Sequence, residues 1–249
     1  MKKTPLARPA FKLSSPATGT EYWIYLEAPE AAREPGPWPA VAFMDGDDQF
    51  RYAAMAYRKL RREGEVRPLL LAGVGYGASY TKPGNRRIRD YTPSAMATEA
   101  GSGGADAFLR FLAGELWPEL ERRYPVEPAL RGLAGHSLGS LLALHALFQH
   151  QPFFNRVLAS APALWWDDRA LLCRTAKLQR NDISIPARLF LGIGQNDTAS
   201  MLAEYEMLED QLAAQPLAGL EVISRRFPDR DHYNVLPDAF GQGLRALFA

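Results

Sequence analysis

The chain has 249 residues, of which 47% are hydrophobic, 23% charged and 11% aromatic. This composition is typical of a soluble globular protein and excludes a disordered, collagen-like or disulfide-rich chain. Because 29 Lys and Arg stand against 28 Asp and Glu, the formal net charge is only +1, which favours neither nucleic acid nor an anionic membrane as a partner. The single cysteine, Cys173, cannot form an internal disulfide, and we interpret it as a small buried hydrophobic residue.

No apolar run approaches the roughly 18 residues that a membrane-spanning helix requires. Met1-Lys2-Lys3 resembles the start of a signal peptide, but residues 4–9 contain no apolar segment to follow it. We therefore expect a cytoplasmic protein, or a periplasmic one whose leader was removed from this sequence.

Short apolar runs typical of buried strands alternate with runs of helical periodicity along the whole chain. The expected strands are 11–14, 22–26, 40–44, 69–74, 130–134, 157–161, 188–193 and 220–227, with a Pro-rich linker at 29–39. The expected helices are 52–62, 105–124, 138–148, 168–178, 201–215 and 236–248. This alternation predicts one α/β domain over residues 1–249, a three-layer sandwich whose mostly parallel central sheet carries helices on both faces.

One long connection departs from this alternation of strands and helices. Residues 76–104, rich in Gly, Ser, Thr and Pro, join an expected strand to an expected helix. Structureless loops longer than about 12–15 residues are uncommon and are usually functional or disordered. Because this loop leaves the carboxyl end of a strand, where open α/β sheets bind ligands, we expect it to border an active site.

The strongest motif is Gly135-His136-Ser137-Leu138-Gly139, which matches G-x-S-x-G between an expected strand and an expected buried helix. Such a turn is too sharp for side chains two residues on either side of the serine, and glycine has none. The serine then projects above the sheet at a helix N-terminus, where N–H groups favour developing negative charge. We interpret Ser137 as the nucleophile of a hydrolase.

A serine hydroxyl needs a base, and histidine is the usual one. His136 adjoins the nucleophile within the turn, while His145 lies along the following helix and His150 near the C-terminus of that helix, both too far to reach back. His232 remains, and it follows the last expected strand, at the carboxyl edge of the sheet. We therefore predict His232 as the general base.

An acid would orient this histidine, and Asp197, directly after the strand at 188–193, is our first candidate. Its alternative role is to cap the next helix. Asp167 and Asp168 follow another strand end, whereas Asp229 and Asp231 stand too close in sequence to the histidine. A serine–histidine dyad without a strong acid is the other open possibility.

The tetrahedral intermediate needs two N–H donors. We expect one from Leu138 and the other from Gly46 or Asp47, in the loop that follows the strand at 40–44. Asp45-Gly46-Asp47 could also be a plain turn or an acidic metal-binding cluster. No second set of carboxylates completes a metal site, so we expect neither metal nor cofactor.

These residues resemble the esterase family of α/β-hydrolases that contains the ferric siderophore esterases and esterase D. The resemblance extends from about residue 22 to residue 248. Its motifs are Tyr22-Trp23-Ile24-Tyr25-Leu26, Phe43-Met44-Asp45-Gly46, Arg89-Asp90-Tyr91-Thr92-Pro93, Gly103-Gly104-Ala105, Gly135-His136-Ser137-Leu138-Gly139, Ser160-Ala161-Pro162-Ala163-Leu164-Trp165-Trp166, and His232 before Val235-Leu236-Pro237. The resemblance implies an α/β-hydrolase fold and a serine ester hydrolase acting on siderophore-type or related hydroxy-acid and aryl esters.

The rim of the site offers candidate substrate contacts. A cluster of guanidinium groups suits an anionic or catechol-oxygen substrate. For Arg86 and Arg87 we favour ordinary solvated charges, whereas Arg89, in the family-like Arg-Asp-Tyr-Thr-Pro run, is a candidate substrate contact.

Trp165 and Trp166 follow a strand end and could line a pocket for an aromatic acyl group, although one of them is expected to be core packing. His136, adjacent to the nucleophile, is a further candidate contact. The expected partner is a small-molecule ester. The alternative functions are acyl transfer to an alcohol, as in related mycolyl transferases, and ligand binding without catalysis on the same fold.

Overall fold

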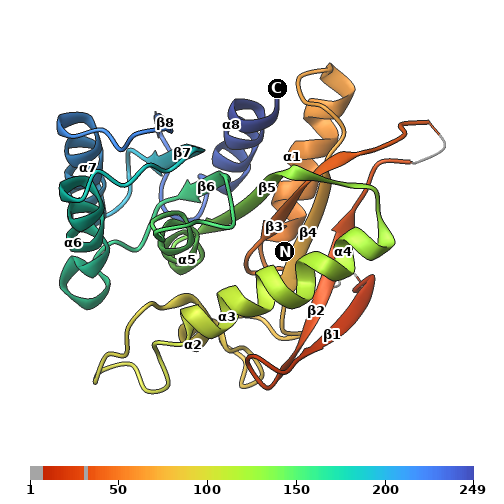
Figure 1. The fold of residues 1–249 in the computed structure, drawn as a ribbon, viewed down its shortest axis with the longest axis horizontal. Helices are drawn as coiled ribbons and strands as arrows, with labels where there is room; N and C mark the ends of the chain where they lie inside the picture. Colours follow the sequence, from red (N-terminus) through yellow and green to blue (C-terminus); the bar gives the residue numbers. More distant parts are fainter. Residues whose placement is uncertain (1–7, 31–32) are drawn as a thin grey trace.

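In the part of the chain that the structure describes, eight strands form one sheet in the order β1-β2-β4-β3-β5-β6-β7-β8, shown in Figure 1. The computed structural model describes residues 8–30 and 33–249; the amino-terminal Met1-Lys2-Lys3 and two residues of the expected linker lie outside them. The strands are β1 Phe11–Ser15, β2 Thr20–Glu27, β3 Trp38–Phe43, β4 Leu70–Gly75, β5 Val126–His136, β6 Arg156–Ser160, β7 Ala187–Gly194 and β8 Leu220–Phe227. Among the described strands, the β1–β2 and β2–β4 pairs are antiparallel and the other neighbouring pairs are parallel.

Helices cover both faces of this sheet, so the expected three-layer α/β fold is confirmed. On one face, α1 (Phe50–Glu63) packs beside α8 (Leu236–Phe248), as Figure 1 shows. The other face carries α3 (Ala105–Phe111), α5 (Leu138–Leu147), α6 (Trp166–Arg180) and α7 (Ala199–Ala214). Successive residues of β3 point to opposite faces of the sheet. Val41 and Phe43 belong to the hydrophobic core beneath α1 and α8, whereas Ala40 and Ala42 belong to the core beneath the other helices.

The sheet contains a switch point that prepares a ligand site. After β3 the chain adds β4 on one side, and it later adds β5 on the other side of β3. The connections that leave β3 and β5 therefore run in opposite directions and open a crevice at their carboxyl ends. The two motifs expected to build the active site, Asp45-Gly46-Asp47 and the serine turn, both follow these strands.

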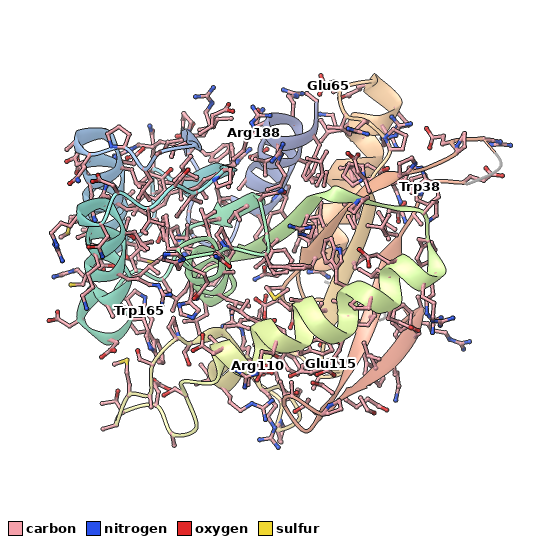
Figure 2. All side chains as sticks on the ribbon, viewed as in Figure 1. Trp38, Glu65, Arg110, Glu115, Trp165 and Arg188 are labelled. Atoms are coloured by element: carbon pink, nitrogen blue, oxygen red, sulfur yellow. The ribbon has the colours of Figure 1, made fainter. Side chains whose placement is uncertain are left out.

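The expected helix at 105–124 is interrupted. A π-helical segment, Leu112–Leu116, separates α3 from α4 (Trp117–Arg123), and the Trp117 N–H donates to the Leu112 carbonyl five residues back. Pro118, which has no N–H for a regular helical bond, follows directly. The carboxylate of Glu115, labelled in Figure 2, accepts hydrogen bonds from Ser15 Oγ and the Ala17 N–H, so this segment anchors the β1–β2 hairpin.

The long connection between β4 and α3 is a loop as expected, but it is not structureless. It contains the short helix α2 (Arg87–Tyr91), and the side chains of Asp90, Tyr91 and Thr92 are buried. Asp90 Oδ2 accepts hydrogen bonds from the hydroxyls of Tyr22 and Tyr76, at 2.8 and 3.1 Å. The middle of the loop is therefore fixed to the sheet.

Among the residues that the structure describes, no helix is long and apolar enough to cross a membrane.

Candidate active site

Ser137 occupies a strained turn between β5 and α5. Its φ of 57° and ψ of −119° lie in a region that residues with a side chain rarely adopt. The strain is maintained by close packing: a Cβ on Gly135 would lie 2.3 Å from the carbonyl atoms of Gly139. A Cβ on Gly139 would lie 3.0 Å from Met44 Cβ, which is tight but less severe. The steric explanation drawn from the motif therefore applies most strongly to Gly135.

The loop between β8 and α8 brings His232 to the same edge of the sheet. Two backbone hydrogen bonds tie this region to the end of β7, from the Gln195 N–H to the Phe227 carbonyl and from the Asn196 N–H to the Arg230 carbonyl. A Cβ on Gly194 would lie 2.3 Å from that Arg230 carbonyl oxygen. Glycine at this position lets the two loops cross closely enough for their side chains to meet.

His232 Nδ1 lies 2.9 Å from Asp197 Oδ2, and the carboxylate of Asp197 is completely buried. The other oxygen, Oδ1, accepts a hydrogen bond from the Thr198 N–H at 2.8 Å. The helix-capping role that competed for Asp197 is performed by Thr198, whose hydroxyl accepts from the Met201 N–H at the start of α7. Asp197 is thus placed to orient the histidine.

The other carboxylates considered from the sequence are placed differently. Asp231 accepts hydrogen bonds from the N–H groups of Tyr233 and Asn234, so it closes the turn that carries the histidine. Asp167 and Asp168 are exposed at the start of α6, and Asp229 lies in the turn after β8. None of these four forms a hydrogen bond or ion pair with His232 among the described residues.

His136 precedes Ser137 in the chain, and its ring contacts the ring of His232. Its ring centroid is 4.6 Å from that of His232, and its Nδ1 lies 3.0 Å from Ser160 Oγ at the end of β6. Burial, followed by the charges of His232 and Arg87, holds the pKa of His136 well below its ordinary value. His136 is therefore a buried neutral ring in contact with His232, whereas the sequence analysis offered it as a candidate substrate contact.

Among the described residues, the backbone N–H groups of Leu138 and Asp47, both at the switch point, have no backbone acceptor. Gly46, the alternative donor, already donates its N–H to the Val74 carbonyl at 2.8 Å. A Cβ on Gly46 would lie 2.7 Å from the Val74 carbonyl carbon, so glycine is needed here for close packing against β4. The Asp47 carboxylate accepts from Tyr25 OH at 2.6 Å and from the Tyr76 and Gly77 N–H groups, which fixes the turn.

A buried ion pair supports the same turn, and the sequence did not reveal it. Arg87 Nε and Nη2 donate to the two oxygens of Asp45 at 2.9 and 3.0 Å. Burial alone would lower the pKa of Arg87, but the charge and hydrogen bonds of Asp45 outweigh it and raise that pKa above its usual value. Arg87 is therefore not a solvated loop charge; it also packs over the ring of Tyr80.

The rim residues fall into an inner and an outer set. Trp166 is buried and donates its indole N–H to the Ser94 carbonyl, whereas Trp165, labelled in Figure 2, is 43% exposed. Tyr233, which the sequence analysis missed, is 81% exposed and meets the His232 ring edge to face. Arg89 binds Asp90 and Thr20, so protein groups already engage the guanidinium that we considered for substrate.

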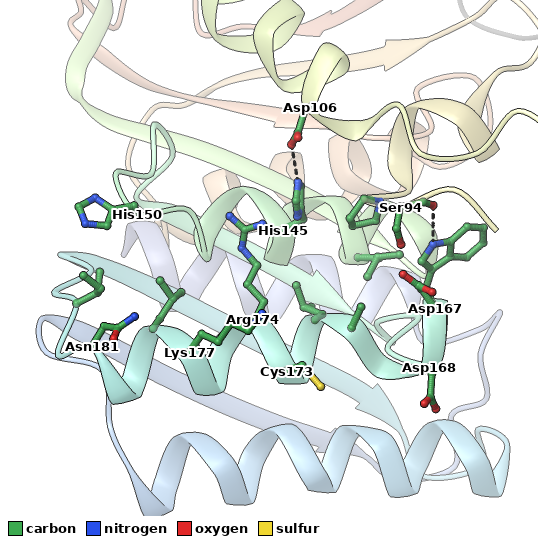
Figure 3. Close-up of a pocket in the computed structure, with 17 residues that line it drawn as sticks. Ser94, Asp106, His145, His150, Asp167, Asp168, Cys173, Arg174, Lys177 and Asn181 are labelled. Atoms are coloured by element: carbon green, nitrogen blue, oxygen red, sulfur yellow. Dashed lines mark hydrogen bonds and ion pairs between the residues drawn. The ribbon is translucent and has the colours of Figure 1, made fainter.

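A cavity of about 950 Å³ lies between α5 and α6, and Ser94 and Trp166 are among the residues that line it (Figure 3). His145, hydrogen-bonded to Asp106 at 2.8 Å, and Arg174 line it, but none of Ser137, Asp197 and His232 does. Cys173 also lines it and is exposed, so its interpretation as a buried residue is wrong. Within residues 8–30 and 33–249, no group of three or more His, Cys, Asp or Glu side chains is arranged to hold a metal ion.

The strand order, the strained serine after β5 and the histidine–aspartate pair after β8 and β7 are those of an α/β-hydrolase with a serine at the nucleophile position. The family model Esterase, described as "Putative esterase", matches residues 15–225. The chain belongs to this family.

Two curated relatives of this chain are named as siderophore esterases. The chain is 27% identical to the ferri-bacillibactin esterase BesA of Bacillus subtilis over 252 residues, which cover 94% of this chain and 86% of the other. It is 36% identical to the siderophore triacetylfusarinine C esterase of Aspergillus fumigatus over 142 residues, which span 55% of this chain and about half (48%) of that relative. The crystal structure of the BES protein from Bacillus cereus superposes with a TM-score of 0.85 at 27% identity, covering 96% of this chain and 94% of that one.

Proposed function

We propose that this protein is a carboxylic ester hydrolase that opens siderophore-type ester bonds through an acyl-enzyme on Ser137. The observation that carries the proposal is the 2.9 Å contact between His232 Nδ1 and the buried Asp197, beside a serine held in a strained turn. Strain of this kind costs of order 1–3 kcal/mol and persists at functional sites, where the surrounding packing enforces it.

The chemistry follows from the two ring nitrogens of His232. Asp197 accepts the Nδ1–H, which leaves Nε2 unprotonated and able to take the proton from Ser137 Oγ. The serine oxygen bonds to the ester carbonyl carbon, and the resulting tetrahedral oxyanion collapses as the alcohol leaves with the proton from His232. Water then attacks the acyl-enzyme by the same route, which releases the carboxylic acid and restores the serine.

The N–H groups of Leu138 and Asp47 are the proposed donors to the oxyanion. They arise on opposite sides of the switch point, after β5 and β3, and neither has a backbone acceptor among the described residues. One such donor typically contributes about 10²–10³ in rate, because it strengthens as the oxygen gains charge. The fixed Asp47 carboxylate keeps the second donor in place without reorganisation.

The proposed substrates are lactones and aryl esters of the siderophore type. Two relatives are named as esterases of bacillibactin and triacetylfusarinine C. Tyr233, exposed beside the ring of His232, and the exposed Trp165 after β6 are the rings on which we propose that planar acyl groups stack. This rim favours aromatic acyl groups over purely aliphatic ones.

The test is ester turnover in the wild-type protein beside Ser137→Ala. We expect nitrophenol release from p-nitrophenyl acetate and butyrate by the wild type and background rates for the variant. A panel of catecholate and hydroxamate lactones then ranks substrates by kcat/KM, with catecholates expected first. Equal activity of wild type and variant would exclude Ser137 as the nucleophile and overturn the proposal.

A further inference from the structure

We propose that His136 is a positioning residue that fixes the plane of the His232 imidazole through direct ring contact. The inference rests on the proposed function, because it concerns the same serine–histidine pair. His136 is the last residue of β5 and adjoins Ser137, while its ring lies 4.6 Å from His232 with a tilt of 48°. One side chain therefore contacts the proposed base and adjoins the proposed nucleophile in the chain.

A second contact is needed because one hydrogen bond does not define the orientation of a ring. Asp197 holds Nδ1, but rotation of the imidazole about that bond would move Nε2 relative to the serine oxygen. Tyr233 touches the ring from another side, yet 81% of Tyr233 is exposed to solvent, so little protein packing restrains it. His136 is the neighbour of His232 that is both aromatic and buried.

The position of His136 is itself well determined. It is opposite Ser160 in the register of β5 and β6, and its Nδ1 lies 3.0 Å from Ser160 Oγ. Both side chains are buried at the ends of adjacent parallel strands. Because His136 is held firmly at the edge of the sheet, its ring can restrict the orientation of the His232 ring, which lies in a loop.

The contact depends on the ring of His136 rather than on a charge or a proton. Its buried Nε2 has no side-chain hydrogen-bond partner in the described part of the chain, so no relay of side chains runs through it, although a backbone group of His232 also lies close to the ring. Burial keeps this imidazole neutral, and a neutral ring does not repel His232 when that residue gains a proton during catalysis. An apolar ring of similar shape should therefore serve the same purpose.

Two variants separate the ring from its hydrogen bond. His136→Asn keeps a polar group for Ser160 but removes the ring, and we expect kcat for p-nitrophenyl acetate to fall by about 10–100-fold with KM within twofold. The double variant His136→Phe with Ser160→Ala keeps a ring and removes both polar partners together, which avoids an unsatisfied buried hydroxyl. We expect this double variant to recover kcat to within about fivefold of wild type.

His145→Asn is the matched control, since it makes the same change at another buried histidine that does not contact the site. It should cost stability without lowering kcat. If His136 acted only through its hydrogen bond to Ser160, the asparagine variant would stay active and the double variant would be impaired. This result would overturn the proposal.

An NMR measurement that requires no ester turnover tests the role of His136 separately from the proposed esterase function. The proton between His232 Nδ1 and Asp197 should give a downfield ¹H NMR resonance in the wild type. We expect this resonance to broaden in His136→Asn and to persist in the double variant. If the wild type hydrolyses no ester, the proposed function fails while this comparison still decides the role of His136; an equally sharp resonance in all three proteins would disprove it.

Discussion

Asp197 and His232 lie 35 residues apart in the chain, yet Oδ2 of the first and Nδ1 of the second are 2.9 Å apart. The two strands that precede them, β7 and β8, are parallel neighbours, so their carboxyl ends meet at one edge. Asp197 is buried and engaged by the Thr198 N–H through its other oxygen, which leaves Oδ2 for the histidine alone.

Asp197→Asn should therefore lower kcat strongly while changing the fold little. The amide can donate to Nδ1 and so select the wrong tautomer of His232, which costs up to about 10⁴ in a serine triad. We expect a loss of at least about 100-fold in kcat for p-nitrophenyl acetate, with KM within threefold. Asp167→Asn is the control, because Asp167 was a rival from the sequence, is exposed, and has a φ of 48° that asparagine tolerates. Equal kcat in wild type and Asp197→Asn would indicate a serine–histidine dyad.

The two glycines of the serine turn should respond unequally to alanine. Gly135→Ala places a Cβ 2.3 Å from the Gly139 carbonyl, a backbone group that cannot move away without opening the turn. We expect it to abolish activity and to lower the free energy of unfolding by about 3 kcal/mol or more, at the upper end of overpacking costs. Gly139→Ala places a Cβ 3.0 Å from Met44 Cβ and 3.4 Å from Asp45 Oδ2, contacts that small shifts can relieve, and should cost about 1 kcal/mol.

Gly114→Ala provides the control for the glycine pair, since nothing lies within 4 Å of the position that its Cβ would take. This helical position should gain up to about 1 kcal/mol from alanine. Urea unfolding of the three variants measures the order. A Gly135→Ala protein as stable as Gly139→Ala would show that the turn is less constrained than its packing indicates.

Local sequence patterns predicted the nucleophile turn and the strand ends, because the motif and its flanking elements are short-range features. The sequence also made Asp197 the first candidate partner of His232, since parallel strands place their carboxyl ends together, but it left other carboxylates and a dyad open. Arg87 could not be found in this way. In sequence it resembles Arg86 and Arg89, and its partner Asp45 stands 42 residues earlier.

The sequence also could not predict which of two adjacent tryptophans at the rim is buried. Trp165 and Trp166 share composition and position after β6, but one lies at the surface and the other is buried with its indole N–H bound. The buried ring is the one that meets the long loop, because the Trp166 indole donates to the Ser94 carbonyl, and this contact between distant segments is not visible in the local sequence. Tyr233 was missed because exposure beside His232 is a property of the folded loop, not of the local pattern.

Arg87 and Asp45 should stabilise the fold mainly because each neutralises the buried charge of the other. Arg87→Met leaves the Asp45 carboxylate buried without its counter-ion, and removing one member of such a pair costs about 3–5 kcal/mol. The double variant Asp45→Asn with Arg87→Met removes both charges and should recover at least half of this loss. Urea unfolding at pH 7 measures both proteins. A double variant no more stable than Arg87→Met would refute the compensation.

The stability of the protein should depend on pH through the buried His145, whose pKa is lowered first of all by burial. Below about pH 6.5 an unfolded histidine binds a proton, whereas the native His145 stays neutral until the pH reaches its lowered pKa. Unfolding in this window is thus coupled to proton uptake, and the free energy of unfolding falls as the pH falls. His145→Gln should reduce the slope between pH 6.5 and 5.5 by up to about 1.4 kcal/mol per pH unit. His150→Gln, at an exposed position, should leave it unchanged, and identical slopes in wild type and His145→Gln would contradict this coupling.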